Sequence, residues 1–232
     1  MATLKELMGQ EVYDLIYKHY DRNGELIGDM EDVFYCDDDE IDQDRIPKLE
    51  ALLTPIADAK NYLVPIEAAK LLAAWGSERS IKYFEDCINE RIDLLGNLDP
   101  HRLHTNYDTT YERIINSLFQ YYSRYAERDY IQSGTYDGDL SKAAKERIKT
   151  PLVKIIGLSK ELVLDMGYLI NILKRQCWKE YLPTLKDCYL NFIKRPESDL
   201  NRQWNLPALK ALLQDWEPDF LRQNRCPVQV SN

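Results

Sequence analysis

The sequence predicts an all-α protein of antiparallel helix pairs, stacked either as a solenoid or as a compact bundle. Three observations support this fold class. Apolar residues recur at steps of three and four along nearly the whole 232-residue chain. Glycine is scarce, with nine residues, and proline is modest, with ten, so the chain is neither a linker nor of low complexity. An alanine-rich segment ends in Gly76, and glycine is the preferred residue just after a helix.

Four helices are expected in the first ninety residues. The first should end at the turn sequence 21–24, and the second should begin near Pro47, a residue suited to a first helical turn. The third covers the alanine-rich stretch up to Gly76, and the fourth follows after a short polar turn. The apolar positions of the first helix are Leu4, Leu7, Met8, Val12, Leu15 and Ile16, and those of the fourth are Ile81, Phe84, Cys87 and Ile88.

A long amphipathic helix is expected over 107–130, followed by a flexible loop over 133–139. The next helix can be capped by Asp139 or Ser141. This helix must end before Thr150-Pro151, because a residue that precedes proline is biased away from the helical conformation.

The C-terminal part should hold helices over 162–177, from 178 onward and over 207–216, before a loosely held tail over 217–232. Cys87 and Cys188 lie 101 residues apart, and Leu72 corresponds to Leu173 at the same offset. The chain therefore holds either a duplicated helical unit or two unrelated amphipathic helix pairs. Since no linker demands two domains, we expect a single α-helical domain over 1–232.

The segment 62–84 resembles a HEAT repeat. Its alanine-rich helix ends in Gly76, a polar residue follows, and Arg79 stands near the start of the next helix. It departs from the usual pattern at Val64-Pro65-Ile66, where a repeat often has a Val-Arg pair. The resemblance implies helix pairs stacked as a right-handed solenoid.

The negative charge of the chain lies at its N-terminal end. Residues 1–50 hold 15 Asp or Glu against 5 Lys or Arg, whereas residues 51–232 hold 24 against 25. Within the acidic segment, 21–45, the stretch 25–44 contains ten acids and no base, interrupted by the apolar residues Val33-Phe34-Tyr35. Such a block is solvated, and its field can steer a basic partner. We expect this segment to form a loop or an interface.

The composition also excludes several classes of protein. A net charge of −9 argues against nucleic acid or an anionic membrane as the main partner, but this argument concerns the average charge and leaves a local basic groove open. The N-terminus has no apolar run typical of a signal peptide, and no stretch is long enough for a membrane span. The five cysteines are scattered and form no CxxC pair, so they are read as reduced thiols of a cytoplasmic protein.

No pattern predicts catalysis. There is no glycine-rich phosphate loop, GxSxG or HExxH motif. His101 and His104 provide half a metal site at best, so no metal or cofactor is expected. Among enzymes with HEAT-like folds, hydroxylases need His-Glu dipeptides that are absent, and alkylpurine glycosylases need a basic groove. The sequence does not exclude a bilin lyase, because the motifs of that family are subtle. We interpret the chain as a binding protein rather than an enzyme.

Tyrosines are the second candidate for binding. Tyr121, Tyr130 and Tyr136 lie in a tyrosine-rich stretch, and not all of its rings can face inward on one helix. Tyrosine is a preferred interface anchor, since it offers area and a hydroxyl at low entropic cost. The alternative is that these rings fill gaps between helices.

In size, composition and expected architecture the chain is similar to immunity proteins of bacterial toxin systems, including contact-dependent growth inhibition. The resemblance implies a partner that is a basic nuclease domain, an RNase or a DNase, with the RNase preferred. The chain would occlude its active site or substrate groove. The residues expected to pair with its Lys and Arg are Asp37, Asp38, Asp39, Glu40, Asp42 and Asp44, and Tyr and Trp side chains would anchor the centre.

The alternative function is a HEAT-like adaptor that holds a peptide or a protein subunit in a concave groove. In that case the acidic segment would be a solvated loop without an energetic role. The concentration of acids into one block favours the inhibitor, because solubility alone needs only dispersed charge. If the block drives recognition, replacing Asp37, Asp38 and Asp39 by Asn should slow association with little loss of stability.

Overall fold

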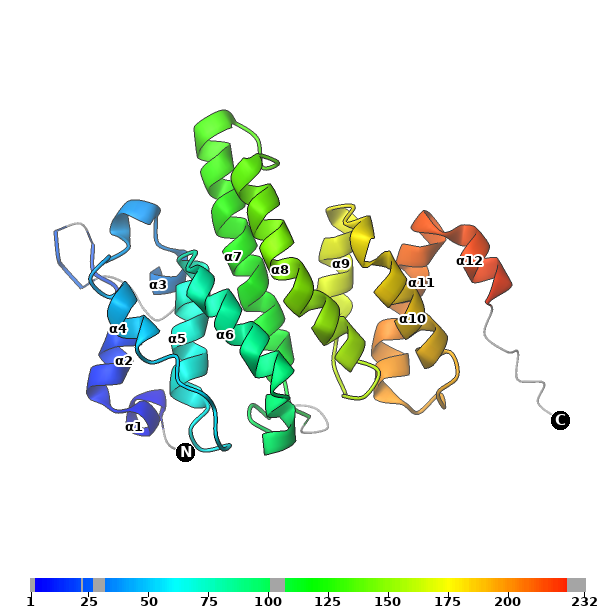
Figure 1. Cartoon of the computed structure of the whole chain (residues 1–232), viewed down its shortest axis with the longest axis horizontal. Helices are drawn as coiled ribbons and strands as arrows, with labels where there is room; N and C mark the ends of the chain where they lie inside the picture. Colours follow the sequence, from blue (N-terminus) through cyan, green and yellow to red (C-terminus); the bar gives the residue numbers. More distant parts are fainter. Residues whose placement is uncertain (1–2, 22, 27–31, 101–106, 225–232) are drawn as a thin grey trace. The chain divides into compact units, whose positions relative to one another are not determined.

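The protein is all-helical, as the sequence predicts, in a computed structural model that describes residues 3–21, 23–26, 32–100 and 107–224 (Figure 1). Within these ranges there is no strand, only two isolated β-bridges. The α-helices are α1 (Leu4–Met8), α2 (Gln10–Tyr17), α3 (Asp32–Tyr35), α4 (Ile46–Glu50), α5 (Leu63–Ala74), α6 (Glu78–Asn89), α7 (Thr110–Ser133), α8 (Asp139–Leu158), α9 (Gly167–Arg175), α10 (Leu182–Phe192), α11 (Leu200–Trp216) and α12 (Pro218–Gln223). Three short 3-10 helices are η1 (Asp38–Glu40), η2 (Ile92–Leu95) and η3 (Lys179–Tyr181).

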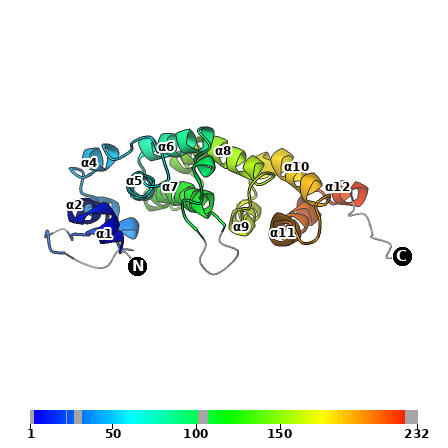
Figure 2. The same ribbon diagram turned by 90° about the horizontal axis from the view of Figure 1, so that it is seen from below.

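The chain folds into two compact units. Unit 1 comprises Met1–Leu98 and Asn116–Pro151, and unit 2 comprises Asp99–Ile115 and Leu152–Asn232. In unit 1, α4 and α6 lie on one side and α2 and α5 on the other (Figure 2). In unit 2, α11 packs against α9, α10 and α12. Helices α7 and α8 supply residues to both units. The expectation of a single domain over 1–232 stays a prediction.

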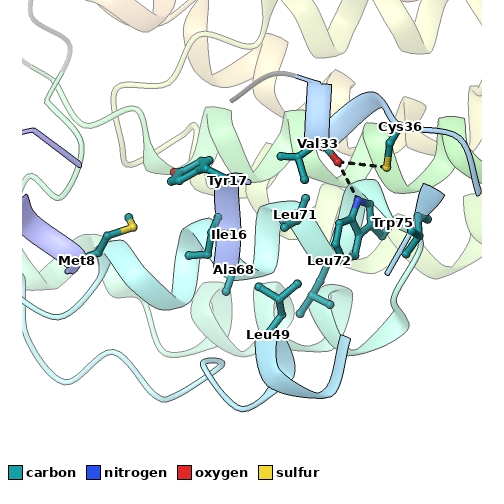
Figure 3. Packing of buried hydrophobic residues seen from close by; sticks show 11 residues of the cluster. Met8, Ile16, Tyr17, Val33, Cys36, Leu49, Ala68, Leu71, Leu72 and Trp75 are labelled. Atoms are coloured by element: carbon teal, nitrogen blue, oxygen red, sulfur yellow. Dashed lines mark hydrogen bonds between the residues drawn. The ribbon is translucent and has the colours of Figure 1, made fainter. Parts of the chain in front are cut away.

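The core of unit 1 surrounds α5, which is buried on nearly all sides. Its Ala68, Leu71, Leu72 and Trp75 pack with apolar residues of the flanking helices (Figure 3). These partners include Ile16, Val33 and Leu49, together with Cys36. The Trp75 indole Nε1 donates to the Val33 carbonyl over 2.9 Å, so the polar atom of this large side chain is satisfied inside the core. Small alanines on α5 allow its neighbours to approach closely.

The helix expected over 162–177 is shorter, as α9 (Gly167–Arg175), and four further sequence predictions differ from the structure. The first predicted helix is broken into α1 and α2 at Gly9, which adopts a φ of +82° that few other residues tolerate. Helix α8 does not end before Thr150-Pro151 but continues to Leu158. Proline removes one helical N–H, and burial of Ile148, Leu152 and Ile155 on the same helix offsets that loss.

The other two differences are in unit 2. Helix α11 begins at Leu200 rather than at Pro207, because the Asp199 side chain caps it by accepting the Arg202 N–H over 3.0 Å. The expected loose tail instead begins with α12, where Phe220 packs edge-on against Tyr189 at 5.9 Å. Residues 225–232 of that tail lie outside the described residues.

The 101-residue offset between Cys87 and Cys188 has a counterpart in backbone hydrogen bonding. Helix α5 ends with Gly76 in the left-handed conformation, and Ser77 N–H donates to Leu72 O over 2.8 Å. Helix α9 ends with Cys177 in the same conformation, and Trp178 N–H donates to Leu173 O over 3.0 Å. Both ends are Schellman caps, and every residue of one cap corresponds to the other at an offset of 101. Each unit therefore contains one helix pair with the same cap.

Candidate functional site

The acidic segment, residues 21–45, contributes to the core of unit 1 through residues 32–45. Val33, Cys36 and Ile41 are buried, and they alternate with exposed acidic residues. Burial of these apolar side chains fixes the backbone that carries the carboxylates. The sequence prediction of a loop or interface therefore needs refinement, because this stretch includes α3 and η1 and contributes to the core.

Arg45 fastens the C-terminal end of the segment to α2. Its buried guanidinium donates to the carbonyls of Leu15 and Lys18, over 2.5 and 2.7 Å, and lies 5.1 Å from the centre of the Trp75 ring. Burial lowers the pKa of Arg45 from its usual value. The two carbonyls lie in the last turn of α2, where an arginine complements the helix dipole.

Two arginines of α7 hold the middle of the segment. Arg128 forms a bidentate ion pair with Asp38, with Nε to Oδ2 at 2.6 Å and a second contact of 2.9 Å. Arg124 is buried and donates to the carbonyls of Ala74 and Cys36, over 2.9 and 2.8 Å. The hydrogen bond from Arg128 lowers the pKa of Asp38 below its usual range. Residues 36–38 are thereby joined to the end of α5 and to α7.

The remaining acids are presented to solvent. Asp37, Asp39, Asp42 and Asp44 are exposed, whereas Glu40 is half-buried and accepts the Asp37 N–H over 3.1 Å. The segment 37–44 therefore combines six carboxylates without a Lys or Arg of its own. The structure brings together all six acids that the sequence predicts. Asp38 is also exposed, but it differs from its neighbours because it forms an ion pair with Arg128.

The three candidate tyrosines have different environments. Tyr121 is only 2% exposed and packs on Tyr125 with ring centres 4.9 Å apart. Its assignment as a surface anchor is wrong for the folded chain, because it lies on the inward face of α7. Tyr130, near the end of α7, and Tyr136, in the turn between α7 and α8, are exposed, and their rings stack with centres 4.4 Å apart and planes 6° apart.

Two exposed apolar residues near the acids escaped the sequence analysis. Tyr35, at the end of α3, is 71% exposed, and Ile131 on α7 is 76% exposed. The signal for Ile131 is its position three residues after Arg128, which places both side chains on one face of α7. Without the ion pair between Arg128 and Asp38, nothing in the sequence relates that face to the acidic segment.

Within the described ranges, no three His, Cys, Asp or Glu side chains are grouped as a metal site requires. His101 and His104 lie outside the described residues. Burial raises the pKa of Cys87 to about 12 and also raises those of Cys36 and Cys188, so these thiols are poor nucleophiles at neutral pH. No helix of the described chain is long and apolar enough to cross a membrane.

Comparison with protein families, with curated proteins and with solved structures finds no match to this chain. The features of the acidic segment in unit 1 are therefore the basis for a functional proposal.

Proposed function

We propose that this chain binds and neutralises a basic nuclease, most directly an RNase, by covering its active site or substrate groove, as an immunity protein does. One observation carries the proposal: the exposed carboxylates of the acidic segment stand on a backbone that is fixed by core packing and by three arginines. A nuclease groove binds phosphates through Lys and Arg side chains, and a row of carboxylates can occupy the same positions.

Fixing the segment before binding favours affinity. A flexible acidic loop would lose conformational freedom when it meets a partner, and that loss opposes association. Here the backbone of 32–45 is already ordered by Val33, Cys36 and Ile41. The field of the exposed acids also speeds encounter with a basic surface, which matters for an inhibitor of a harmful enzyme.

The test uses the full chain as bait in a lysate of the source cell at low salt, followed by elution with salt. The acidic variant replaces Asp37, Asp39, Asp42 and Asp44 by Asn. The control replaces four exposed acids of unit 2, Glu161, Glu180 and Glu197 by Gln and Asp219 by Asn, and so changes the net charge equally. A basic nuclease that the wild type and the control both bind and inhibit, and the acidic variant does not, is the expected result.

Two outcomes contradict the proposal. Equal capture and inhibition by the acidic variant would show that these carboxylates do not recognise the nuclease. Several unrelated partners that salt does not release would instead support an adaptor.

A further inference from the structure

The acidic segment is flanked by the two most exposed apolar side chains of its neighbourhood, Tyr35 and Ile131. Tyr35 precedes Asp38 by three residues on the same segment. Ile131 follows Arg128 by one helical turn, and Arg128 holds Asp38 at 2.6 Å. Both side chains belong to unit 1, with Tyr35 at the end of α3 and Ile131 one helical turn beyond Arg128 on α7. The surface is therefore mixed, with apolar groups beside carboxylates.

Tyr35 and Ile131 are exposed among charged side chains. Tyr17 and Val33 in the same region are buried, so the core had room for apolar side chains, yet Tyr35 and Ile131 point outward. Large apolar side chains surrounded by polar groups are typical of the centre of a protein interface, with the charged groups at its rim.

The imidazole of His19 is buried beside the acidic segment, and its polar atoms are not satisfied there. His19 is 5% exposed, and its two ring nitrogens have no hydrogen-bond partner among the described residues. Its Nε2 faces Oε2 of Glu40 at 3.9 Å, which is too long for a hydrogen bond. A buried polar group without a partner is costly.

We infer that the partner is a folded basic protein that sets an apolar patch against Tyr35 and Ile131 and surrounds it with Lys and Arg that meet Asp37, Asp39 and Asp42. This inference rests on the proposed function and specifies the partner of that same site. Charge complementarity selects a basic surface, and the apolar pair selects a structured one, because a disordered polycation offers no fixed apolar patch to bury.

The experiment compares the apolar variant, Tyr35→Ser with Ile131→Ser, against the acidic variant and against Tyr168→Ser. Tyr168 is an exposed tyrosine of unit 2, and its replacement is the matched control. The two probes are the basic protein captured by the wild type and poly-L-lysine, which has charge without an apolar patch. Circular dichroism and thermal unfolding first establish that each variant is folded.

For the captured protein, we expect the apolar variant to bind about 30-fold more weakly at every salt concentration, with an unchanged salt slope, as for the loss of an interface hot spot. Poly-L-lysine should bind the apolar variant as it binds the wild type. Tyr168→Ser should change neither affinity.

The possible failures are distinct. If the apolar variant binds the captured protein as tightly as the wild type while the acidic variant fails, the inference is wrong and the proposed function stands. If the acidic variant also binds normally, the proposed function is wrong as well. An equal loss of poly-L-lysine binding in the apolar variant would mean that the substitutions disturb the acidic segment itself, and this would overturn the reading of Tyr35 and Ile131 as direct contacts.

Discussion

Among the six acids of the segment 37–44, Asp38 forms a bidentate ion pair with Arg128. The sequence makes no distinction between Asp37, Asp38 and Asp39, because it does not reveal that α7 passes beside them. The expectation that all three could be replaced with little loss of stability therefore needs a correction for Asp38.

The pKa of Asp38 predicts how stability depends on pH. Since Arg128 lowers the pKa of Asp38 in the folded chain below its ordinary 3.8, the ion pair stabilises the fold above that value. This contribution is lost as the pH falls below 3.8 toward the lowered pKa. Asp38→Asn should therefore reduce stability at pH 7 and flatten the acid limb of the stability profile. Urea unfolding between pH 7 and pH 3 measures this, with Asp37→Asn as the control. Equal profiles for the two variants would contradict the role of the ion pair.

Cys177 occupies a left-handed position, φ +53°, that its counterpart Gly76 occupies without a side chain. Removing the Cβ relieves an unfavourable conformation, so Cys177→Gly should stabilise the protein by about 0.5–1 kcal/mol after the entropic cost of glycine. Gly76→Ala should destabilise it by about 1–2 kcal/mol, since its Cβ would also lie 3.2 Å from Arg128. Chemical denaturation measures both changes. A loss of stability in Cys177→Gly would indicate that its thiol makes a favourable contact.

At the scale of elements, the turn between α7 and α8 is closed by a side chain of α7. Asp129 is buried and accepts the backbone N–H groups of Ser141, over 2.7 Å, and Leu140, over 3.4 Å. Burial acts to raise the pKa of Asp129, but these hydrogen bonds outweigh it, and the pKa lies below its usual value. The sequence predicts Asp139 or Ser141 as the cap of α8. In the structure, Asp129 caps α8 from a position ten residues before Asp139, and a local sequence pattern does not extend that far.

Gly138 leaves the space that this carboxylate needs. A Cβ at Gly138 would lie 2.4 Å from Asp129, so Gly138→Ala should displace the cap and destabilise the protein by about 1–2 kcal/mol. The cost should shrink in an Asp129→Ala background, because the displaced group is then absent. Thermal unfolding of the two single variants and the double variant gives this coupling. If the stability losses of the two single variants added up to that of the double variant, Gly138 would act through its own backbone conformation instead.

The helices that the sequence predicts well are those whose apolar period is uninterrupted, such as α6 and α7. The cap at Gly76 is also confirmed, because glycine itself supplies the signal. The misplaced ends concern Gly9, Pro151 and Pro207, where a local preference competes with packing. Packing wins at both prolines, which lie inside helices. The acids of the candidate site were found from composition, whereas Tyr35, Ile131 and His19 depend on contacts that only the fold supplies.

On the scale of the whole molecule, charge follows the division into units. Unit 1 has 27 Asp and Glu against 16 Lys and Arg, whereas unit 2 has 12 against 14. The net charge of −9 is therefore a property of unit 1. At physiological ionic strength salt screens the field of unit 1 over about 8 Å, so this field acts on a basic partner at the last stage of its approach.

This asymmetry predicts the kinetics of association. The rate constant for binding the captured basic protein should fall as salt is added, and this fall should be smaller for the acidic variant than for the unit 2 control, although both variants lose the same charge. The reason is that steering depends on where the charge lies relative to the interface. Stopped-flow measurements from about 10 to 300 mM salt provide the comparison. Equal slopes for the two variants would mean that net charge alone sets the rate.

The ion pair between Asp38 and Arg128 also bears on how such a protein can change over generations. Under the proposed function, a change in the partner's surface must be matched by changes in this chain that leave it folded. Asp37, Asp39, Asp42 and Asp44 are exposed and can mutate at little cost to stability, whereas Asp38, Arg124 and Arg128 support the segment and must be retained together. Related chains with different partners should therefore vary at the other exposed acids and keep these three residues. Partner specificity would then change while the backbone of the segment stays the same.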